Sequence, residues 1–400
     1  MKILIVTEVF YPENFHINDA AKELAKRGHQ IEVLTRQPSY PQGFVYQGYS
    51  NDDYSKDFWE GITIHRFNTI EGYKTSKLKK IANYIHFVRA GKKIISKIIN
   101  NVDVILVYQT GPLTLALPAV YARRKFKIPT IIWTFDIWPD AVYMYGFPKV
   151  FPLTAYLNSI LKKVYRNVDK ILVSSKRFTD TIKLYCGDTP IEYAPNWLIE
   201  SDSVESTLKI PQDKNNFVFT GNISKAQNLE NVIKGFSAAG LSNSMLHIIG
   251  DGSTLEALKK LSLDLHTNNI IFHGRHPYNE MKNILSQSDY LILPLVSKAG
   301  IDKTEPFKIQ SYLQAKKPIY GIINGAGREI IEENHLGLCA NPDSVSAIAE
   351  GFKSMLKISE EEKKAIAKHA EDLMLHRFNR KQIIDVVENN LHEISHIKLS

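Results

Sequence analysis

The sequence contains little cysteine: Cys186 and Cys339 are the only two among 400 residues. They lie far apart and outside any metal-binding spacing, which excludes a disulfide-stabilised scaffold and a cysteine-based zinc site. Such sparse usage is typical of proteins that work in a reducing compartment. We expect both cysteines to be small core side chains.

The chain also lacks a long uninterrupted apolar run. Its first ten residues, MKILIVTEVF, hold a short apolar stretch that ends at Glu8, which is too short for a signal peptide and predicts a first strand. Residues 104–122 carry no charge, but the sequence QTGP at 109–112 divides them into a strand and a helix. We therefore expect no membrane-spanning segment.

Low-complexity tracts are absent, and a content of 44% hydrophobic and 23% charged residues is typical of a globular protein. Four hundred residues exceed what one hydrophobic core usually supports, so we expect two domains. Residues 1–200 hold 27 Lys and Arg against 18 Asp and Glu, whereas residues 201–400 hold 23 against 24. The basic first half indicates an anionic partner, either a membrane or a nucleic acid.

Strand-like and helix-like segments alternate along most of the chain. The first series of strands reads KILIVT, IEVLT, ITIHRF, DVILVY, PTIIWTF and KILVSS, and the second reads NFVFTGN, MLHIIGDG, NIIFHGR and YLILPLV. Strands separated by single helices imply parallel crossovers. The predicted fold class is α/β, with two Rossmann-like doubly wound domains facing a cleft, because such sheets bind ligands beyond the carboxyl ends of their strands.

A polar stretch with two prolines, residues 191–215, separates the two series and predicts an interdomain linker. We place an N-terminal domain at residues 1–195 and a C-terminal domain at residues 196–375. The last residues, 376–400, are predicted to form a C-terminal helix that could cross back to the N-terminal domain.

The stretch TFDIWPD, residues 134–140, places a carboxylate at the end of a buried strand. A buried charge is costly unless something pairs with it. As the N-cap of the next helix Asp136 would be ordinary. However, Trp133, Trp138 and Pro139 would make a stiff, aromatic-walled corner that suits a sugar ring. We therefore favour a functional role for Asp136.

The loop FTGNISKAQNL, residues 219–229, follows the first strand of the second series. Gly221 permits a tight turn there, and Asn222 and Lys225 stand near the start of a helix, where a lysine and the helix dipole fit a pyrophosphate. The alternative is that Lys225 is an ordinary surface lysine.

Two other loops have weaker anion-binding patterns. Asn14, in YPENFHIND, precedes a helix expected near Asn18, although a plain N-cap loop explains it equally well. Further along, Glu305 and Pro306 open a helix on which Lys308 and Ser311, three residues apart, would share one face.

Two motif matches are rejected. HEISH, residues 392–396, has the H-E-x-x-H spacing of metalloproteases, but its position near the chain end predicts a solvated helix without a surrounding core. GDGSTL, residues 250–255, lacks the third glycine of a dinucleotide-binding fingerprint.

Residues 74–97 form a basic amphipathic helix with eight Lys and Arg and no acidic residue. This pattern suits the interface of an anionic membrane, and a solvated helix that packs its apolar face on the domain is an equal alternative. Nucleic acid is not favoured, because no binding module accompanies the charge. The predicted membrane-binding residues are Lys77, Lys79, Lys80, Arg89, Lys92 and Lys93.

In their order and spacing, these loops resemble those of family 4 of the retaining glycosyltransferases, which have the two-domain GT-B fold. The likeness is greatest to bacterial O-antigen and capsule N-acetyl-L-fucosamine transferases and colanic-acid fucosyltransferases. It extends along nearly the whole chain, through YPENFHIND, PSYPQGFVYQGY, DIWPD, GNISKAQNL, IIGDGS, FHGRHPYNEM and PFKIQSYLQAKKP.

The resemblance implies a metal-independent enzyme without a cofactor, whose leaving phosphate helps to deprotonate the acceptor hydroxyl. Lys225 and Asn222 would hold the donor pyrophosphate, and charge stabilisation by the lysine and helix termini would assist its departure. The backbone of His276 would contact the base. Asp136 and Glu305 are the predicted catalytic residues. The predicted donor-binding residues are Asn14, Gly221, Asn222, Lys225, His276, Lys308 and Ser311.

The sequence departs from the family pattern at two places. The family commonly has two glutamates separated by seven residues, and Lys303 and Ser311 occupy those positions. Glu305 is a candidate replacement for the first glutamate, and Ser311 could still bond a ribose hydroxyl. A glycine pair that often follows the first strand is replaced by Asn14 and Phe15.

The resemblance implies transfer of N-acetyl-L-fucosamine from its UDP form to a polyprenyl-diphosphate-linked saccharide, for capsule or O-antigen. The partners would be this nucleotide sugar, the lipid-linked acceptor and an anionic membrane, with the enzyme peripheral on the cytoplasmic face of the cell membrane. A sugar-nucleotide 2-epimerase of GT-B fold is the enzymatic alternative, and a membrane- or nucleic-acid-binding scaffold is the non-enzymatic one. Residues 196–375 would form the domain that binds the nucleotide-sugar donor. Residues 1–195 would form the domain that binds the acceptor and faces the membrane.

Overall fold

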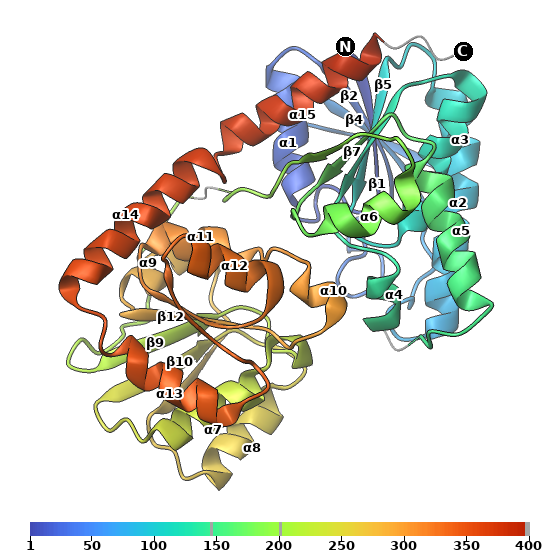
Figure 1. Ribbon diagram of the computed structural model, residues 1–400. Coiled ribbons are helices and arrows are strands. Elements are labelled where there is room, and N and C mark those ends of the chain that lie inside the picture. Colours follow the sequence, from blue (N-terminus) through green and yellow to red (C-terminus); the bar gives the residue numbers. More distant parts are fainter. Residues whose placement is uncertain (145–146, 200–201, 397–400) are drawn as a thin grey trace. The chain divides into compact units, whose positions relative to one another are not determined.

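The computed structural model describes residues 1–144, 147–199 and 202–396. The chain divides into two compact units, which are treated separately below (Figure 1). The N-terminal unit comprises Met1–Asn196 together with the segment that begins at Arg380, and the C-terminal unit comprises Trp197–Asn379. The polar stretch at 191–215 therefore contains the first crossing between units, although its residues 200 and 201 lie outside the described ranges.

The N-terminal unit is built on an eight-stranded sheet in the order β3-β4-β2-β1-β5-β6-β7-β8. All neighbouring strands are parallel except β3 and β4, which are antiparallel. The strands are β1 (Lys2–Thr7), β2 (Gln30–Arg36), β3 (Ser55–Trp59), β4 (Ile62–Phe67), β5 (Val104–Gln109), β6 (Thr130–Thr134), β7 (Lys170–Val173) and β8 (Ile191–Tyr193).

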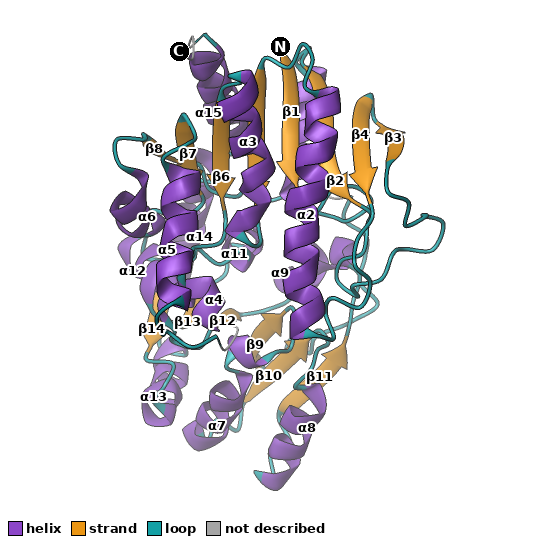
Figure 2. Ribbon diagram, turned by 90° about the vertical axis from the view of Figure 1, so that its right-hand side faces the viewer, coloured by secondary structure: helices purple, strands orange, loops and turns teal. Residues whose placement is uncertain are grey.

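Helices cover both faces of this sheet. The helices α2, α3 and α5 lie over one face, and α1 and α15 lie over the other (Figures 1 and 2). The helices of the unit are α1 (His16–Lys26), α2 (Lys77–Ile98), η1 (Leu113–Ala116), α3 (Leu117–Phe126), α4 (Asp140–Met144), α5 (Leu153–Tyr165), α6 (Phe178–Cys186) and α15 (Arg380–Ser395).

Burial on both faces explains why the central strands read as continuous apolar runs. Every residue of β5 and β6 is buried, as is all of β1 after Lys2. Turns and helix starts separate these runs. One helix start is at Ser76, whose side chain accepts a hydrogen bond from the backbone N–H of Lys79 and caps α2.

The C-terminal unit has a six-stranded sheet in the order β11-β10-β9-β12-β13-β14, and all its paired strands are parallel. This is the strand order of a Rossmann fold. The strands are β9 (Asn215–Thr220), β10 (Ser244–Ile249), β11 (Ile270–Gly274), β12 (Tyr290–Pro294), β13 (Ile319–Ile322) and β14 (Gly337–Ala340).

Two hydrophobic clusters fill the space between this sheet and the helices on its two faces. The helices of the unit are η2 (Lys225–Gln227), α7 (Leu229–Ala239), α8 (Leu255–Asp264), η3 (Tyr278–Glu280), α9 (Met281–Ser286), α10 (Ala299–Asp302), α11 (Lys308–Ala315), α12 (Gly325–Glu333), α13 (Val345–Met355) and α14 (Glu360–His376).

Strand order reverses once in each sheet, between β1 and β5 in the N-terminal unit and between β9 and β12 in the C-terminal unit. Parallel α/β sheets bind ligands at such points, beyond the carboxyl ends of the strands. The predicted fold class, two Rossmann-like doubly wound domains, is confirmed. The predicted series of strands has none between IEVLT and ITIHRF, yet the stretch between them contains the edge strand β3 (Figure 2).

HEISH was expected to lie on a solvated helix without a surrounding core. Its His392, Glu393 and His396 are exposed, but the expected absence of a core is wrong. Within α15 the side chains of Ile384, Val387, Leu391 and Ile394 are buried, because the helix packs against α1, β5 and β7 of the N-terminal unit (Figure 1). These residues recur at helical spacing, so the apolar stripe is visible in the sequence. Across the described residues, no helix has both the length and the apolar character needed to cross a membrane.

Candidate functional site

Four strands of the N-terminal unit bring three charged side chains and a glycine to the point where strand order reverses. Glu8 follows β1, Arg36 ends β2, Gly111 follows β5 and Asp136 follows β6. All four residues line one groove of about 840 Å³ within this unit. That volume is in the range of sites that bind small organic ligands.

Asp136 is half-buried in the wall of this groove. Burial, and secondarily the negative charge of Glu8, raises the pKa of Asp136 to about 7. The helix α4 begins at Asp140, four positions later, so Asp136 is not placed as its N-cap. A carboxyl group of this pKa in a cleft can hold or accept a proton at neutral pH.

The aromatic corner expected around Asp136 is only partly present. Trp138 lines the groove, but Trp133 is fully buried and donates its indole N–H to the carbonyl of Ala194 at 2.9 Å. The expectation that Trp133 faces a sugar ring is therefore wrong. Trp133 lies within β6, whose two faces are both covered, so neither face of the strand is open to a ligand.

Glu8 and Arg36 were not predicted as site residues. A Cβ at Gly111 would lie 2.0 Å from Oε1 of Glu8, so the glycine is needed where the carboxylate packs against the loop after β5. Arg36 is buried and its Nη1 has no hydrogen-bond partner among the described residues. Glu8 ends an apolar strand as Asp136 does, and the same reasoning from sequence would have found it.

The groove continues from these polar groups into an apolar section between α2, α4 and α5. Its apolar lining includes Ile81, Tyr84, Ile85, Val88, Val142, Phe147, Leu153, Tyr156, Leu157 and Ile160. Ile81, Ile85 and Tyr156 are 42%, 48% and 61% exposed. Large apolar side chains that are exposed as a group are unusual and typically mark an interaction site.

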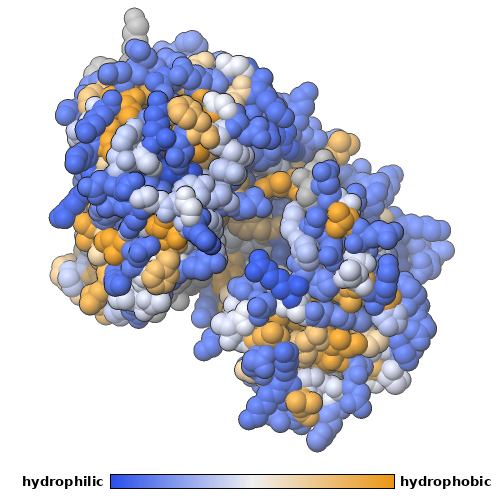
Figure 3. All heavy atoms as spheres, turned by 180° about the vertical axis from the view of Figure 1, so that it is seen from behind, coloured by the Kyte–Doolittle hydropathy of each residue, from blue (hydrophilic) through white to orange (hydrophobic). Residues whose placement is uncertain are grey.

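More apolar side chains are exposed beside the groove. Phe151, which lies just before α5, is 85% exposed, and Leu78 at the start of α2 is 79% exposed. Figure 3 shows hydrophobic side chains gathered at the end of the N-terminal unit where α4 and the adjoining ends of α2 and α5 lie. This end of the unit therefore presents an apolar surface.

Basic side chains of α2 flank the same groove. Of the predicted membrane-binding residues, four line it, namely Lys77, Lys80, Arg89 and Lys92, whereas Lys79 and Lys93 lie on α2 outside its lining and are exposed. Lys74 also lines the groove, and desolvation lowers its pKa while Glu8 opposes that shift. The same cause lowers the pKa of Lys80. The C-terminal part of α2 instead packs on the unit through Phe87, Ile94 and Ile95.

Asn14 is exposed and does not line the groove. In its loop the neighbouring residue, Glu13, is the buried one. The carboxylate of Glu13 accepts hydrogen bonds from the backbone N–H groups of Ser39 and Tyr40, at 2.8 and 2.7 Å, and of Phe10. The helix α1 begins at His16, two residues before the expected start near Asn18.

In the C-terminal unit, glycines let two strand-end loops touch. A Cβ at Gly250, after β10, would lie 1.8 Å from the carbonyl oxygen of Gly221, after β9, and Gly250 has a φ of +143°. The GDG sequence rejected as a dinucleotide fingerprint thus has a steric role. It brings the backbone of the two loops together beside Lys308.

Lys308, the first residue of α11, extends over these loops. Its Nζ donates to Oε1 of Gln227 at 2.5 Å and lies 4.0 Å from the centre of the Phe219 ring. A Cβ at Gly221 would lie 2.6 Å from its Cε, so side chain and loop are in close contact. Desolvation lowers the pKa of Lys308 to about 7. Among the described residues, no carboxylate forms an ion pair with it, which leaves the amine suited to an external anion.

Lys225 and Asn222 are exposed on the same loop, which is held by the bond from the N–H of Ile223 to the carbonyl of Asp251 at 2.8 Å. The loop thus brings together Gly221, Asn222, Lys225 and Lys308, four of the predicted donor-binding residues. Among the described residues, only one group of three or more side chains is close enough together to bind a metal ion. It belongs to the N-terminal unit and consists of His29, Glu388 and His392.

Ser311 lies in a different setting from Lys308. Together with Tyr278 and residues of α9 it lines a second cavity, of about 190 Å³, within the C-terminal unit. His276 precedes this cavity in the chain, and its Nδ1 lies 3.1 Å from Oε2 of Glu280, which also accepts from Ser206 at 2.8 Å. These bonds fix the loop that carries His276.

Glu305 is buried, with 7% of its surface exposed, and its Oε1 accepts a hydrogen bond from Nη2 of Arg377 at 2.9 Å. It immediately precedes Pro306 and the first turn of α11. This ion pair joins the start of α11 to the segment that follows α14, so Glu305 is placed to hold Lys308 in position.

Comparison with protein families gives two matches of consecutive parts of the chain. Residues 14–198 match the model for "Glycosyltransferase Family 4", and residues 201–372 match the model for "Glycosyl transferases group 1". The chain is 24% identical over 394 residues to a putative colanic acid biosynthesis glycosyl transferase, WcaI, of Escherichia coli K12, which covers 89% of this chain and 92% of that relative.

Solved structures show the same fold at low sequence identity. A trehalose-6-phosphate structure from E. coli bound with UDP-2-fluoro glucose has a TM-score of 0.74 at 11% identity and covers 99% of each chain. HepE of Anabaena in complex with UDP has a TM-score of 0.68 at 13% identity and covers 98% of this chain and 100% of the other. Between them the two family models account for nearly the whole sequence, and the chain is a family 4, group 1 glycosyltransferase with the GT-B fold.

Proposed function

We propose that this glycosyltransferase moves a sugar from a nucleoside diphosphate to a saccharide carried on a polyprenyl diphosphate. The observation that carries the proposal is the groove of the N-terminal unit, which runs from Asp136 to exposed apolar side chains and is flanked by amines. A lipid-linked acceptor has the matching sequence of parts: a hydroxyl-bearing sugar, an anionic diphosphate and an apolar chain.

The acceptor would lie with its sugar near Asp136 and Arg36 and its diphosphate near Lys74, Lys77 and Lys80. The first prenyl units would then contact Ile81, Ile85 and Tyr156. Exposed apolar side chains flanked by lysines suit the interface of an anionic membrane, where such an acceptor is found. We therefore place the enzyme peripherally on the cytoplasmic face of the cell membrane.

The donor would bind the C-terminal unit. Lys308 and Lys225 would hold the diphosphate against the backbone of Gly221 and Asn222, since amines and loop N–H groups stabilise the charge that develops as the diphosphate leaves. The cavity beside Ser311 and Tyr278 is the candidate site for the nucleoside. UDP is the proposed nucleotide because solved structures of the same fold contain it.

In the proposed reaction the acceptor oxygen forms a bond to the anomeric carbon as the bond from that carbon to the diphosphate oxygen breaks. The hydroxyl proton passes to the departing diphosphate on the same face, so the configuration is retained without a protein nucleophile or a metal. Asp136 would orient the acceptor hydroxyl, and Glu305 would act through Lys308 as a positioning residue.

N-acetyl-L-fucosamine is the proposed sugar because the loop motifs of the sequence resemble those of transferases of that sugar, and a relative, WcaI, is named for the synthesis of a surface polysaccharide, colanic acid. Sugar choice depends on contacts worth about 1–3 kcal/mol, so a panel of UDP-sugars tests this point separately. The 2-epimerase alternative is not favoured, because the family matches are to glycosyltransferases. It would convert the UDP-sugar without any acceptor.

The test compares a polyprenyl-diphosphate saccharide with the same saccharide on a short water-soluble aglycone. Ile85→Ser should raise the KM for the lipid acceptor about tenfold and leave the soluble acceptor and UDP binding unaffected, since a buried prenyl contact is worth about 1–2 kcal/mol. Leu263→Ser, at an exposed leucine of α8, is the matched control. Equal KM values for both acceptors in the parent protein would disprove the lipid assignment.

A further inference from the structure

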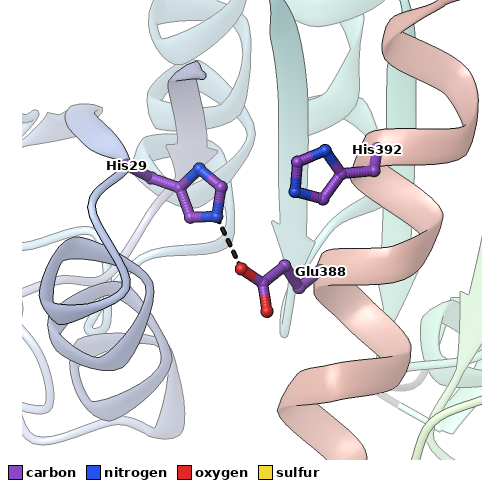
Figure 4. Close-up of side chains that lie close together, drawn as sticks. All are labelled: His29, Glu388 and His392. Atoms are coloured by element: carbon purple, nitrogen blue, oxygen red, sulfur yellow. Dashed lines mark hydrogen bonds and ion pairs between the residues drawn. The ribbon is translucent and has the colours of Figure 1, made fainter.

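The C-terminal helix returns to the N-terminal unit beside a second cluster of side chains, separate from the groove. His29 stands immediately before β2, and Glu388 and His392 lie four residues apart on α15. Side chains at that spacing project from consecutive turns of one helix face. Figure 4 shows the two histidine rings and the carboxylate directed toward a common space.

The distances in this cluster are short. Nε2 of His29 lies 2.7 Å from Oε1 of Glu388, and the centres of the two histidine rings are 5.5 Å apart. One ligand atom from each of the three residues lies within 4.8 Å of the others. Ligand atoms around a tetrahedral zinc ion with bonds of about 2.0–2.1 Å are roughly 3.3 Å apart. Because His392 is exposed, its side chain has room to rotate and bring its ligand atom closer to the other two.

Two of the three side chains are already held in place. The His29 side chain is only 6% exposed, and its Nδ1 lies 3.4 Å from the amino group of Met1. The other oxygen of Glu388, Oε2, accepts a hydrogen bond from Nη1 of Arg27 at 2.6 Å. The bond from Arg27 is an outer-shell bond that orients the carboxylate, and Oε1 of Glu388 is directed at Nε2 of His29.

Arg27 continues into a network that joins α1 to α15. It also donates to Asp385 at 2.6 Å, and Arg380 pairs with Asp19 and Glu23 of α1. The cluster lies at the end of this network. Because Arg27 is itself satisfied by Glu23 and Asp385, Glu388 can share its charge with a cation at Oε1 without leaving the arginine unpaired.

We propose that His29, Glu388 and His392 bind a divalent metal ion of the zinc class, with water in the remaining position. Two imidazoles and one carboxylate favour Zn²⁺ and its late first-row neighbours over Mg²⁺ or Ca²⁺, which prefer oxygen ligands. The exposed His392 leaves the site open to solvent for entry. The ion would take the place of the proton between Nε2 and Oε1 and would link α15 to the start of β2.

The proposed ion has no part in the transfer reaction, and the site lies outside the residues that line the groove. It also differs from the H-E-x-x-H pattern of the sequence. That pattern pairs His392 with His396, whereas in the structure the partners of His392 are Glu388, one turn earlier, and His29. Binding would stabilise the fold, because the ion contacts the native arrangement and not the unfolded chain.

The experiment uses the full chain without a histidine tag, stripped with EDTA and then freed of chelator. Calorimetric titration with ZnCl₂ should show one saturable site, and 100 μM ZnCl₂ should raise Tm by at least 3 °C, whereas MgCl₂ should not. Co²⁺ should give intense d–d absorption bands, the spectroscopic sign of a four-coordinate site, in place of the weak bands of the aqua ion. The absence of saturable zinc binding by the parent chain would overturn the proposal.

Variants assign the ligands. His392→Ala should weaken zinc binding at least tenfold, and since this side chain is exposed the variant is expected to fold. His396→Ala, in the same pentapeptide and also exposed, is the matched control and should bind zinc as the parent does. Glu388→Gln removes the charge of a second ligand and should also weaken zinc binding. Equal zinc affinity in His392→Ala and the parent would show that the ion binds elsewhere and would reject the site.

Discussion

The two units have closely related sheets and different chemistry at the ends of their strands. In the N-terminal unit the strand ends carry large charged side chains, Glu8, Arg36 and Asp136, beside a wide groove. In the C-terminal unit they carry glycines and one half-buried amine, Gly221, Gly250 and Lys308. Large side chains are suited to shaping a site for one particular ligand, whereas backbone N–H groups with an amine are suited to any diphosphate, as proposed above for the two units. One fold thus serves two kinds of recognition.

The largest effect should come from the N-terminal unit. Asp136→Asn keeps the shape but removes the ionisable group, so the rate of transfer at saturating substrate should fall at least about a hundredfold. UDP affinity should be unchanged, because the residues proposed to bind the donor belong to the other unit. Isothermal binding and initial-rate assays on the same sample separate the two outcomes. Transfer at the parent rate would remove Asp136 from the mechanism.

The same variant tests the pKa of Asp136 through stability. A pKa raised from 3.8 to about 7 means that the folded protein binds this proton more tightly than the unfolded chain. Stability from this group is therefore greatest below about pH 4 and declines as the pH rises through 7. Asp136→Asn should be about 1–2 kcal/mol more stable than the parent at pH 8, after allowance for partial exposure, and no more stable at pH 4. Urea unfolding at both pH values measures this difference.

The backbone contact of the C-terminal unit should come next. Gly250→Ala places a Cβ 1.8 Å from the oxygen of Gly221, so the unit should lose about 2–4 kcal/mol of stability and most of its UDP binding. Gly240→Ala is the control, since Gly240 also has a positive φ, +64°, but no heavy atom lies within 4 Å of the added Cβ. It should cost only about 1 kcal/mol. Equal losses in both variants would mean that strain, and not the loop contact, determines the cost.

A smaller effect is expected from Lys308→Met, which should weaken UDP binding about 10- to 100-fold, as expected for a buried charge-assisted contact. With a pKa lowered to about 7, Lys308 loses its proton as the pH rises, and a bound diphosphate favours the protonated form. The parent should therefore bind UDP more weakly at pH 8.5 than at pH 6.5. This dependence should be largely absent in Lys308→Met, and an identical pH profile in the two proteins would contradict the assignment.

The smallest effect separates positioning from catalysis. Glu305→Gln keeps the size of the side chain and weakens its pairing with Arg377, so UDP affinity should fall a few-fold while turnover stays within about tenfold of the parent. Glu332→Gln, which breaks the exposed pair with Arg328, should change neither quantity. If turnover instead fell about a thousandfold while UDP binding stayed normal, Glu305 would be a catalytic residue.

Much of the fold follows from the sequence, because parallel strands buried on both faces read as apolar runs with turns between them. Asp136 was found since it interrupts such a run. Trp133 was misjudged because a chain position next to Asp136 does not reveal that a side chain lies inside the sheet. The contact between Gly221 and Gly250 could not be predicted, since it depends on two loops that are distant in sequence. The apolar stripe of α15 is visible in the sequence as residues at helical spacing. Its burial was not predicted, because a position near the end of the sequence suggested a solvated helix.

The return of α15 to the N-terminal unit has a consequence for biosynthesis. The chain leaves that unit after Asn196 and re-enters it only at Arg380, so a ribosome has made the entire C-terminal unit before the first unit can be completed. Until the segment from Arg380 onward has emerged, α1 lacks the helix that covers it and its charged partners on α15. The segment that begins at Arg380 thus completes the unit made first, and a message that stops before Arg380 would yield a whole C-terminal unit joined to an unfinished N-terminal one.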